Sequence, residues 1–288
     1  MGFDYVDRQT HLYFPGCTLS TKARSLDVAA RAAASSLGVP LQELPDWTCC
    51  GATFPLAVDN LMALSGPARI LADARLLGAE LVTLCAACYN ILQRTNHWLR
   101  AQPEKRDTLN YFIERDYRGD LRVMHYLELL RDVVGFETVA ARVVRPLAGL
   151  RVAPYYGCLL LRPPGELGLD DPERPTLLGR LLASLGCQVV EYPMAAECCG
   201  SYLAVSAPEA AAECTSNVLL SAARAGADCI VAACPLCHFN LGAWQDSARQ
   251  RHPSFGGLPV YYFTELLALA LGVGDELEGQ SLRDVMPS

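Results

Sequence analysis

The sequence predicts an α/β protein made of two duplicated domains, each built around a parallel β-sheet. Three observations carry this prediction: a set of five cysteines occurs twice, strand-like and helix-like segments alternate in both halves, and short apolar motifs recur. The motifs recur after about 140 residues, a period far too long for a solenoid repeat and typical of a duplicated domain. We therefore expect two Rossmann-like domains, residues 1–145 and 146–288, related by a pseudo-twofold axis.

The first half alternates strands and helices along its length. Short apolar runs predict strands, and longer Ala- and Leu-rich stretches predict helices, two of which stop at Gly38 and Gly78. The expected strands are 11–14, 41–44, 81–84 and 122–126, and the expected helices are 21–37, 61–77, 87–99 and 127–134. Because helices connect successive strands, the sheet should be parallel and doubly wound.

The second half repeats this plan, with strands expected near Val152, Val189, Ile230 and Val260. The segment 140–150 contains proline and glycine and is expected to join the two domains. A chain of 288 residues is long enough to give each half its own hydrophobic core.

The two cysteine sets share one spacing. In each set a single cysteine is followed by an adjacent pair, then by a glycine, and finally by a Cys-x-x-Cys motif that begins 35 residues after the pair. Clustered thiolates at fixed spacing bind soft metal ions or iron–sulfur clusters. The first set is Cys17, Cys49, Cys50, Cys85 and Cys88, and the second is Cys158, Cys198, Cys199, Cys234 and Cys237.

Four of these cysteines, Cys17, Cys85, Cys158 and Cys234, follow an expected strand and precede a helix. Ligands of open α/β sheets gather at the carboxyl ends of strands, and helix N-termini there favour the thiolate over the thiol. We therefore expect iron–sulfur sites at the strand carboxyl ends. Five thiolates exceed the four that a cubane cluster or a zinc ion takes. The spacing alone predicts an unusual cluster or one spare thiol, with structural zinc in at least one set as the alternative.

Composition and charge exclude several classes of function. The formal net charge is −7 and basic residues form no run, which argues against nucleic-acid binding. No segment approaches the ~20 consecutive apolar residues that a membrane-spanning helix needs. Residues 1–11 lack the apolar core of a signal peptide. We therefore expect a cytoplasmic protein whose thiols stay reduced.

At the two cysteine sets the chain resembles the CCG-domain family, and within it the B-type subunits of heterodisulfide reductases. Smaller matches are Gly157-Cys-x-Leu-Leu-Arg-Pro163, Ala233-Cys-Pro-Leu-Cys-His238 and the segment 259–272, so the resemblance covers nearly the whole chain. It implies a noncubane [4Fe–4S] cluster on each complete set, two in all, which reductively cleave a disulfide in two one-electron steps. The run Ser201-Tyr202-Leu203 departs from the glycine-rich run of many family members at this point.

The resemblance also implies partner proteins. Electrons would arrive from a heterodisulfide reductase C-like subunit with cubane [4Fe–4S] clusters, and beyond it from a flavin-containing A-like subunit. The Arg- and Ala-rich composition indicates a bacterial protein, and bacterial relatives serve sulfur oxidation or flavin-based electron bifurcation. In sulfur oxidation the substrate would be a protein-bound thiol or lipoyl group, with a lipoate-binding protein as a further partner.

Two other functions remain open. One is a CCG-type electron-relay subunit of a flavin-dependent complex that oxidises a 2-hydroxy acid or glycerol-3-phosphate. The other is a scaffold subunit whose cysteines bind structural zinc. No ferredoxin-type Cys-x-x-Cys-x-x-Cys run precedes the repeat, which favours the catalytic subunit over the relay subunit.

Two residues beside the cysteines are candidates for direct roles. His238 follows the last cysteine and is a candidate acid for a leaving thiolate; the alternative is a hydrogen bond to the backbone or to cluster sulfur. Arg162 lies four residues after Cys158 and is a candidate for binding an anionic substrate; the alternative is an ordinary salt bridge. The cysteines outside the sets are expected to be small buried apolar residues, namely Cys187, Cys214 and Cys229.

Overall fold

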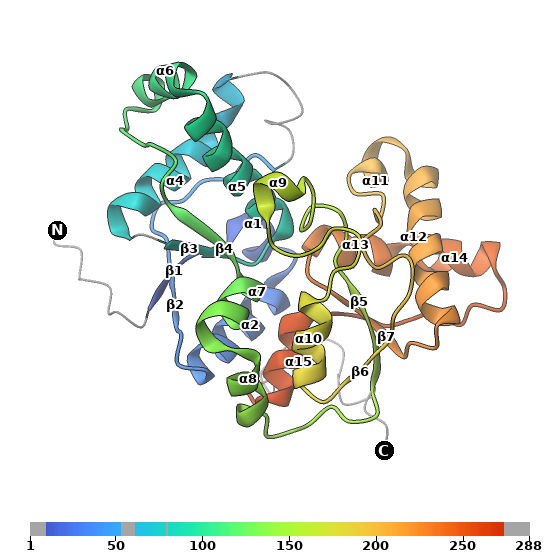
Figure 1. The fold of residues 1–288 in the computed structure, drawn as a ribbon. Coiled ribbons are helices and arrows are strands. Elements are labelled where there is room, and N and C mark those ends of the chain that lie inside the picture. Colours follow the sequence, from blue (N-terminus) through green and yellow to red (C-terminus); the bar gives the residue numbers. More distant parts are fainter. Residues whose placement is uncertain (1–9, 53–60, 79, 274–288) are drawn as a thin grey trace.

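The protein contains two four-stranded parallel sheets, one in each half of the chain (Figure 1). The structure is a computed structural model that describes residues 10–52, 61–78 and 80–273. Residues 1–9, on which part of the localisation prediction depends, lie outside these ranges. The expected fold class is confirmed.

The first half builds its sheet in the order β2-β1-β3-β4, and all three pairings are parallel. Its elements are β1 (His11–Phe14), α1 (Gly16–Leu19), α2 (Arg24–Ser36), β2 (Leu41–Glu43), η1 (Leu61–Leu64), α4 (Ser65–Leu77), β3 (Glu80–Thr83), α5 (Ala86–Ala101), α6 (Pro103–Ile113), β4 (Arg122–His125), α7 (Tyr126–Glu128), η2 (Leu129–Val134) and α8 (Phe136–Arg142).

The second half uses the same order, β6-β5-β7-β8, again with parallel pairings throughout. Its elements are β5 (Arg151–Tyr155), α9 (Pro164–Leu167), α10 (Leu177–Ser184), β6 (Gln188–Val189), α11 (Leu203–Ser206), α12 (Pro208–Arg224), β7 (Cys229–Ala232), α13 (Pro235–Ala243), α14 (Gln245–Arg251), β8 (Val260–Tyr262) and α15 (Phe263–Ala270).

The central strands are apolar because helices cover both faces of each sheet. All four residues of β7 are buried, and so are the last three of β1 and β3. Such near-continuous apolar runs are typical of parallel strands. The edge strands β2 and β6 are short and partly exposed, and the adjacent cysteine pairs lie in the loops that follow them.

The last strand of each half passes directly into a helix through the same local motif. The Glu128 carboxylate accepts a hydrogen bond from the His125 backbone N–H at 2.8 Å, and Glu265 accepts one from Tyr262 at the same distance. Each glutamate therefore caps its own helix N-terminus. The repetition of this detail supports the duplication that the sequence predicts.

The two halves pack against each other reciprocally. Helix α15 of the second half packs on α2 of the first, where the Thr264 hydroxyl donates to the Leu26 carbonyl at 3.0 Å. Helix α8 of the first half packs on α10 of the second, with the Arg180 guanidinium 5.4 Å from the Phe136 ring centre. In each case a helix that follows the last strand of one half covers a helix of the other half. The covered helix, α2 or α10, connects the first two strands of its own half. This is the exchange that a pseudo-twofold arrangement produces.

A second contact joins the halves next to the cysteines. The Asn90 amide on α5 donates to the carbonyl of Leu159 at 2.7 Å and to the carbonyl of Arg162 at 2.8 Å. Arg94, one turn further along α5, lies 3.2 Å from the Glu166 carboxylate on α9. The helix that begins in the first cysteine set is thus fixed to the loop that follows Cys158.

The structure refines several expected boundaries. Residues 129–134 form a π-helix, and residues 61–64 form a 3₁₀ turn that leads into α4. Helix α6, over 103–113, was not expected, because that stretch is mostly polar. The expected junction lies between α8 and β5, and the division at residues 145 and 146 stays a prediction. Within the described ranges, no helix is both long enough and apolar enough to cross a bilayer.

Candidate metal centres

The first cysteine set gathers at the carboxyl ends of β1, β2 and β3. Cys17 lies in α1, the adjacent pair lies in the loop after β2, and Cys85 occupies the residue before α5. The sulfurs approach in pairs: Cys17 and Cys49 are 3.8 Å apart, and Cys50 and Cys88 are 3.4 Å apart. The first of these pairs is exposed and the second is buried. The set therefore has an anchored inner side and a side open to solvent.

The second set repeats the arrangement at β5, β6 and β7. Cys199 and Cys237, the counterparts of the buried pair, have their sulfurs 3.5 Å apart. Cys234 occupies the residue before α13 and is buried, whereas Cys198 is exposed and Cys158 is partly exposed. The two sets thus share not only spacing but also a buried inner side and an open outer side.

Two constraints explain why residues 16 and 157 are glycines: the backbone conformation and the space that a side chain would need. Both glycines have a positive φ, +73° and +64°, which side chains rarely adopt. A Cβ atom on Gly16 would lie 2.9 Å from the Cys88 sulfur, and one on Gly157 would lie 2.9 Å from the Cys237 sulfur. The glycine before the first cysteine of each set therefore makes room for the last cysteine of that set.

Hydrogen bonds between thiols of one set shift the pKa values of the two partners in opposite directions. Hydrogen bonding to Cys88 lowers the pKa of Cys50, and hydrogen bonding to Cys158 lowers the pKa of Cys198 to about 6. The pKa of Cys85 is also lowered, first by Cys88 and then by backbone N–H groups at the start of α5. The same hydrogen bonds raise the pKa of the partner thiols Cys88 and Cys158, so one thiol of each pair gives up its proton more readily than the other.

The donor set also indicates what kind of metal group fits. Within the described ranges, no three cysteine, histidine or acidic side chains surround a single point closely enough to hold one metal ion. A zinc ion holds four ligands at about 2.3 Å from one centre. A multi-iron cluster spreads its ligands over several metals, as five thiolates meeting in pairs would require. The five thiolates of each set exceed the four that one zinc ion takes, so this donor set fits a multi-iron cluster.

Both cysteine sets lie within electrostatic reach of the same side chains. Burial, followed by charges at Cys85, Cys234, Cys50 and Cys88, raises the pKa of Tyr202 to about 12. These cysteines come from both sets, although Tyr202 itself lies just after the second adjacent pair. Both sets therefore act electrostatically on Tyr202, whose side chain is exposed.

Tyr262, at the end of β8, is a second side chain of this kind. Its pKa is raised first by burial and then by charges that include Cys234 and Cys85, one from each set. Unlike Tyr202, Tyr262 is buried. Charges from both sets thus act on one buried tyrosine and one exposed tyrosine.

His238 stacks on this buried tyrosine. Its ring lies 4.0 Å from the Tyr262 ring, nearly parallel to it, and its Nε2 lies 3.1 Å from the Val260 carbonyl. Burial lowers the pKa of His238, so the neutral ring donates its proton to that carbonyl. The backbone hydrogen bond considered from sequence is present, and a role as proton donor stays a prediction.

Arg162 is held by three acceptors. Its guanidinium donates to the carbonyls of Ala196 at 2.8 Å and Pro172 at 3.0 Å, and to the carboxylate of Glu173 at 3.0 Å. The ordinary salt bridge considered from sequence is therefore present. Arg162 braces the loop that leads to the second adjacent pair, and a contact with substrate stays a prediction.

Three further cysteines lie outside the sets. Cys187 and Cys229 are buried as expected, and burial raises the pKa of both to about 12. Cys214, on α12, is partly exposed instead and is not among the buried residues of that helix. Burial raises the pKa of Cys214, and charge at Cys198 raises it further, so Cys214 lies near the second set.

Asn240 is the main feature of the site that sequence reasoning misses. It is fully buried on α13, three residues after Cys237, and its amide donates to the sulfur of Cys199 at 3.5 Å. A polar residue at this spacing from a ligand is the only sequence signal for it. The corresponding residue of the first half is Ile91.

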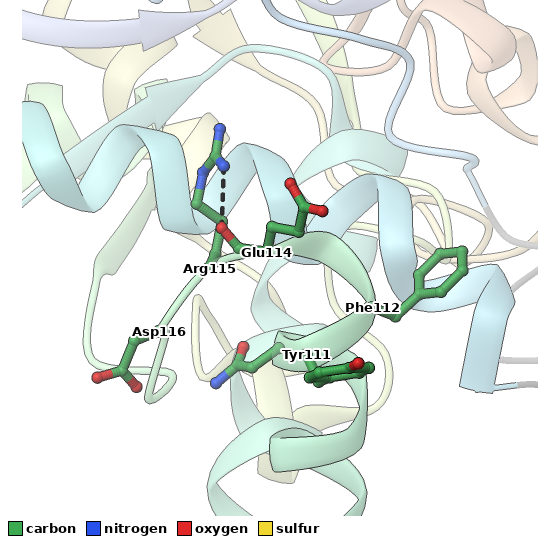
Figure 2. Close-up of a pocket in the computed structure, with 6 residues that line it drawn as sticks. Tyr111, Phe112, Glu114, Arg115 and Asp116 are labelled. Atoms are coloured by element: carbon green, nitrogen blue, oxygen red, sulfur yellow. Dashed lines mark hydrogen bonds between the residues drawn. The ribbon is translucent and has the colours of Figure 1, made fainter.

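A shallow depression at the end of α6 lies apart from these sites. It is lined by residues 110–112 and 114–116, and Figure 2 shows the Arg115 guanidinium donating to the Glu114 carbonyl, at 3.0 Å. Tyr111 and Phe112 are exposed at its rim. No cysteine lines it, so it contributes nothing to the metal centres.

Comparisons with known proteins agree with the doubled site. A model of the CCG cysteine-rich domain matches residues 11–93 and 152–242. The chain is 34% identical over 266 residues to the 8-methylmenaquinol:fumarate reductase membrane anchor subunit of Wolinella succinogenes, covering 91% of this chain and 92% of that protein. It is 30% identical over 271 residues to the B-type subunit of the ferredoxin/F420H2-dependent CoB-CoM heterodisulfide reductase of Methanosarcina acetivorans, covering 92% and 90% respectively.

Among solved structures, a hypothetical protein from Helicobacter pylori superposes with a TM-score of 0.74 at 13% sequence identity. The match covers 97% of this chain but 51% of the other, so this chain spans about half the length of that protein. At this identity the likeness concerns the fold alone.

Proposed function

The chain belongs to the CCG cysteine-rich domain family, and on this premise we propose that it is the catalytic subunit of a heterodisulfide reductase-like complex. As a relative of the B-type subunits of heterodisulfide reductases, it is an iron–sulfur redox subunit that works with partner subunits. The proposed chemistry is thiol–disulfide redox chemistry at two noncubane [4Fe–4S] clusters. The proposed substrate is a protein-bound lipoyl or thiol group in bacterial sulfur oxidation.

One observation carries this proposal: both five-cysteine sets are complete and have the same geometry. In each set a buried pair of sulfurs, Cys50 with Cys88 or Cys199 with Cys237, anchors the inner side. The outer side, with Cys17 and Cys49 or with Cys198, is exposed. A cluster bound there would exchange single electrons with a substrate sulfur that reaches the open side.

The chain's own residues prepare the sites for that chemistry. Gly16 and Gly157 leave room for the sulfur of the last cysteine of each set. Charges from both sets act on Tyr202 and Tyr262. A substrate sulfur held between the two sets would therefore be close to both cluster sites. Two electron carriers beside one substrate suit a disulfide, because its cleavage needs two electrons.

Metal content is the direct test of the cofactor assignment. We expect anaerobically purified protein to be brown and to contain roughly eight irons per chain, because each complete set would hold a four-iron cluster. Iron, sulfide and zinc analysis of the same fresh preparation measures this. Stoichiometric zinc with little iron would contradict the assignment and favour a scaffold subunit.

His238 can be tested without disturbing the stack on Tyr262. A His238→Phe variant keeps an aromatic ring and removes both nitrogens. General acids contribute ~10²–10⁴-fold to rate, whereas we expect a loss well below that range, because the ring's only proton is already donated to the Val260 carbonyl. Turnover of the assembled complex measures the effect. A loss within that range, with both clusters retained, would assign the proton-donor role to His238.

A second candidate function is favoured by the relative with 34% identity, whose name describes a subunit of a quinol:fumarate reductase. In that case the chain would relay electrons between a quinol and a partner subunit rather than act on a disulfide. Assays of the assembled complex with a menaquinol analogue and with a lipoyl disulfide separate the two functions. Activity with the quinol alone would replace the first proposal.

The proposed partners follow from the same assignment. They are a C-like subunit with cubane clusters, a flavin-containing A-like subunit and a lipoate-binding protein, in the cytoplasm, where thiols stay reduced. Purification of the tagged chain from its own host, followed by identification of co-purifying proteins, tests all three. A partner set without any flavin or iron–sulfur protein would contradict the proposal.

A further inference from the structure

The second cysteine set contains a side-chain hydrogen bond to a ligand sulfur whose donor has no counterpart at the matching position of the first set. The Asn240 side chain is fully buried on α13, and its NH₂ group lies 3.5 Å from the Cys199 sulfur. The same group donates to the carbonyl of Cys199 at 3.2 Å and to the carbonyl of Ser201 at 3.0 Å. All three neighbours are acceptors, so the amide nitrogen, and not its oxygen, must face the ligand cysteine.

The other end of this amide has no comparable partner. The Asn240 Oδ1 atom is buried and makes no hydrogen bond within the described ranges. A buried, unpaired carbonyl oxygen costs about 1–3 kcal/mol. The amide is thus held with its oxygen unpaired and its NH₂ group facing the Cys199 sulfur and two backbone carbonyls.

The corresponding position in the first half is apolar. Ile91 lies three residues after Cys88 on α5, as Asn240 lies three residues after Cys237 on α13, and Ile91 is also buried. An isoleucine side chain has no proton to donate. The Cys50 sulfur, the counterpart of Cys199, therefore receives no side-chain N–H from this position.

We propose that Asn240 is a positioning residue that raises the reduction potential of the cluster on the second cysteine set, and so makes the two clusters unequal. This deepens the proposed function, because it assumes that both sets hold clusters. An N–H group aimed at a ligand sulfur stabilises the added negative charge of the reduced cluster, and hydrogen bonds to sulfur are a recognised determinant of cluster potential. An electron shared by the two clusters is thereby drawn toward the second.

The test is a redox titration of the anaerobic holoprotein, followed by electron paramagnetic resonance. In Asn240→Leu we expect the midpoint potential of one cluster to fall while that of the other is unchanged. The Cys234→Ser variant, which removes a ligand of the second set, identifies which signal belongs to which cluster. Unchanged potentials in Asn240→Leu would overturn the proposal.

A matched control variant distinguishes the effect of the hydrogen bond to the Cys199 sulfur from the effect of holding the loop that contains Cys199. The Thr215 hydroxyl donates to the same Cys199 carbonyl at 3.0 Å but is not bonded to the sulfur. Thr215→Val should therefore leave both potentials unchanged. An equal fall in Thr215→Val and Asn240→Leu would assign the effect to the loop and overturn the proposal.

The reciprocal variant keeps the proposal testable if Asn240→Leu fails to retain its cluster. Ile91→Asn places an amide at the matching position of the first set and should raise the potential of the first cluster alone. No change in that variant would then count against the proposal. Failure of the proposed function has a different signature, because a zinc-bound protein would give no titrating cluster in any variant.

Discussion

The Cys237→Ser variant is expected to lose all turnover while keeping its fold. Cys237 is buried in the first turn of α13, and its sulfur lies 3.5 Å from that of Cys199 on the inner side of the second set. A serine hydroxyl is a hard, weakly acidic donor that does not replace a thiolate on iron. The strands of the second sheet do not depend on this side chain, so the cluster should be lost before the sheet is disturbed.

The measurement is disulfide reduction, and thiol oxidation in reverse, by the assembled complex, together with iron content and circular dichroism. Cys187→Ser is the matched control, because Cys187 is similarly buried but lies outside both sets. It should keep its iron and its turnover. Full activity in a Cys237→Ser protein shown to lack the second cluster would move the chemistry to the first set, which begins with Cys17.

Much of this architecture could be predicted because the cysteines follow apolar runs. Strand β7 is wholly apolar and buried, and β3 buries Leu81 and Val82, so these runs mark the residues just before Cys234 and Cys85. Helix α6 was missed because few of its residues, Leu109 and Ile113 among them, are buried. Its polar surface gives little of the periodic apolar pattern by which helices are recognised.

The ten ligands could be predicted from spacing, whereas their surroundings could not. The amide of Asn240 contacts Cys199, which lies 41 residues away along the chain, and the Arg162 guanidinium reaches Ala196 over 34 residues. Such contacts depend on how loops from different strands meet at one sheet edge. A spacing pattern records which residues belong to a site, but not which tertiary contacts adjust it.

The Gly157→Ala variant is expected to lose the second cluster although it adds only one methyl group. The added Cβ would lie 2.9 Å from the Cys237 sulfur, closer than such contacts allow, so the ligand would have to move. The residue also has a φ of +64°, where a non-glycine residue costs about 1–2 kcal/mol. Iron content should fall to about half, because the first set is untouched.

Gly168→Ala is a closely matched control for the backbone effect. Gly168 has a φ of +63°, nearly identical to that of Gly157, but no atom lies within 4 Å of where its Cβ would be. This variant should bear the same backbone strain, about 1–2 kcal/mol in the free energy of unfolding, and keep its full iron content. An equal loss of iron in both variants would show that strain, and not the contact with Cys237, disrupts the site.

The duplication extends this prediction to the first half. Gly16→Ala should remove the first cluster, because its Cβ would lie 2.9 Å from the Cys88 sulfur. Gly38→Ala is the control: its Cβ would meet no atom within 4 Å, so the first cluster should be retained. Each glycine variant alone should therefore keep about half of the iron, and the double variant of Gly16 and Gly157 should keep almost none. Electron paramagnetic resonance of the two single variants should then show two different remaining clusters. Loss of both clusters from either single substitution would mean that the two sites assemble as one unit instead.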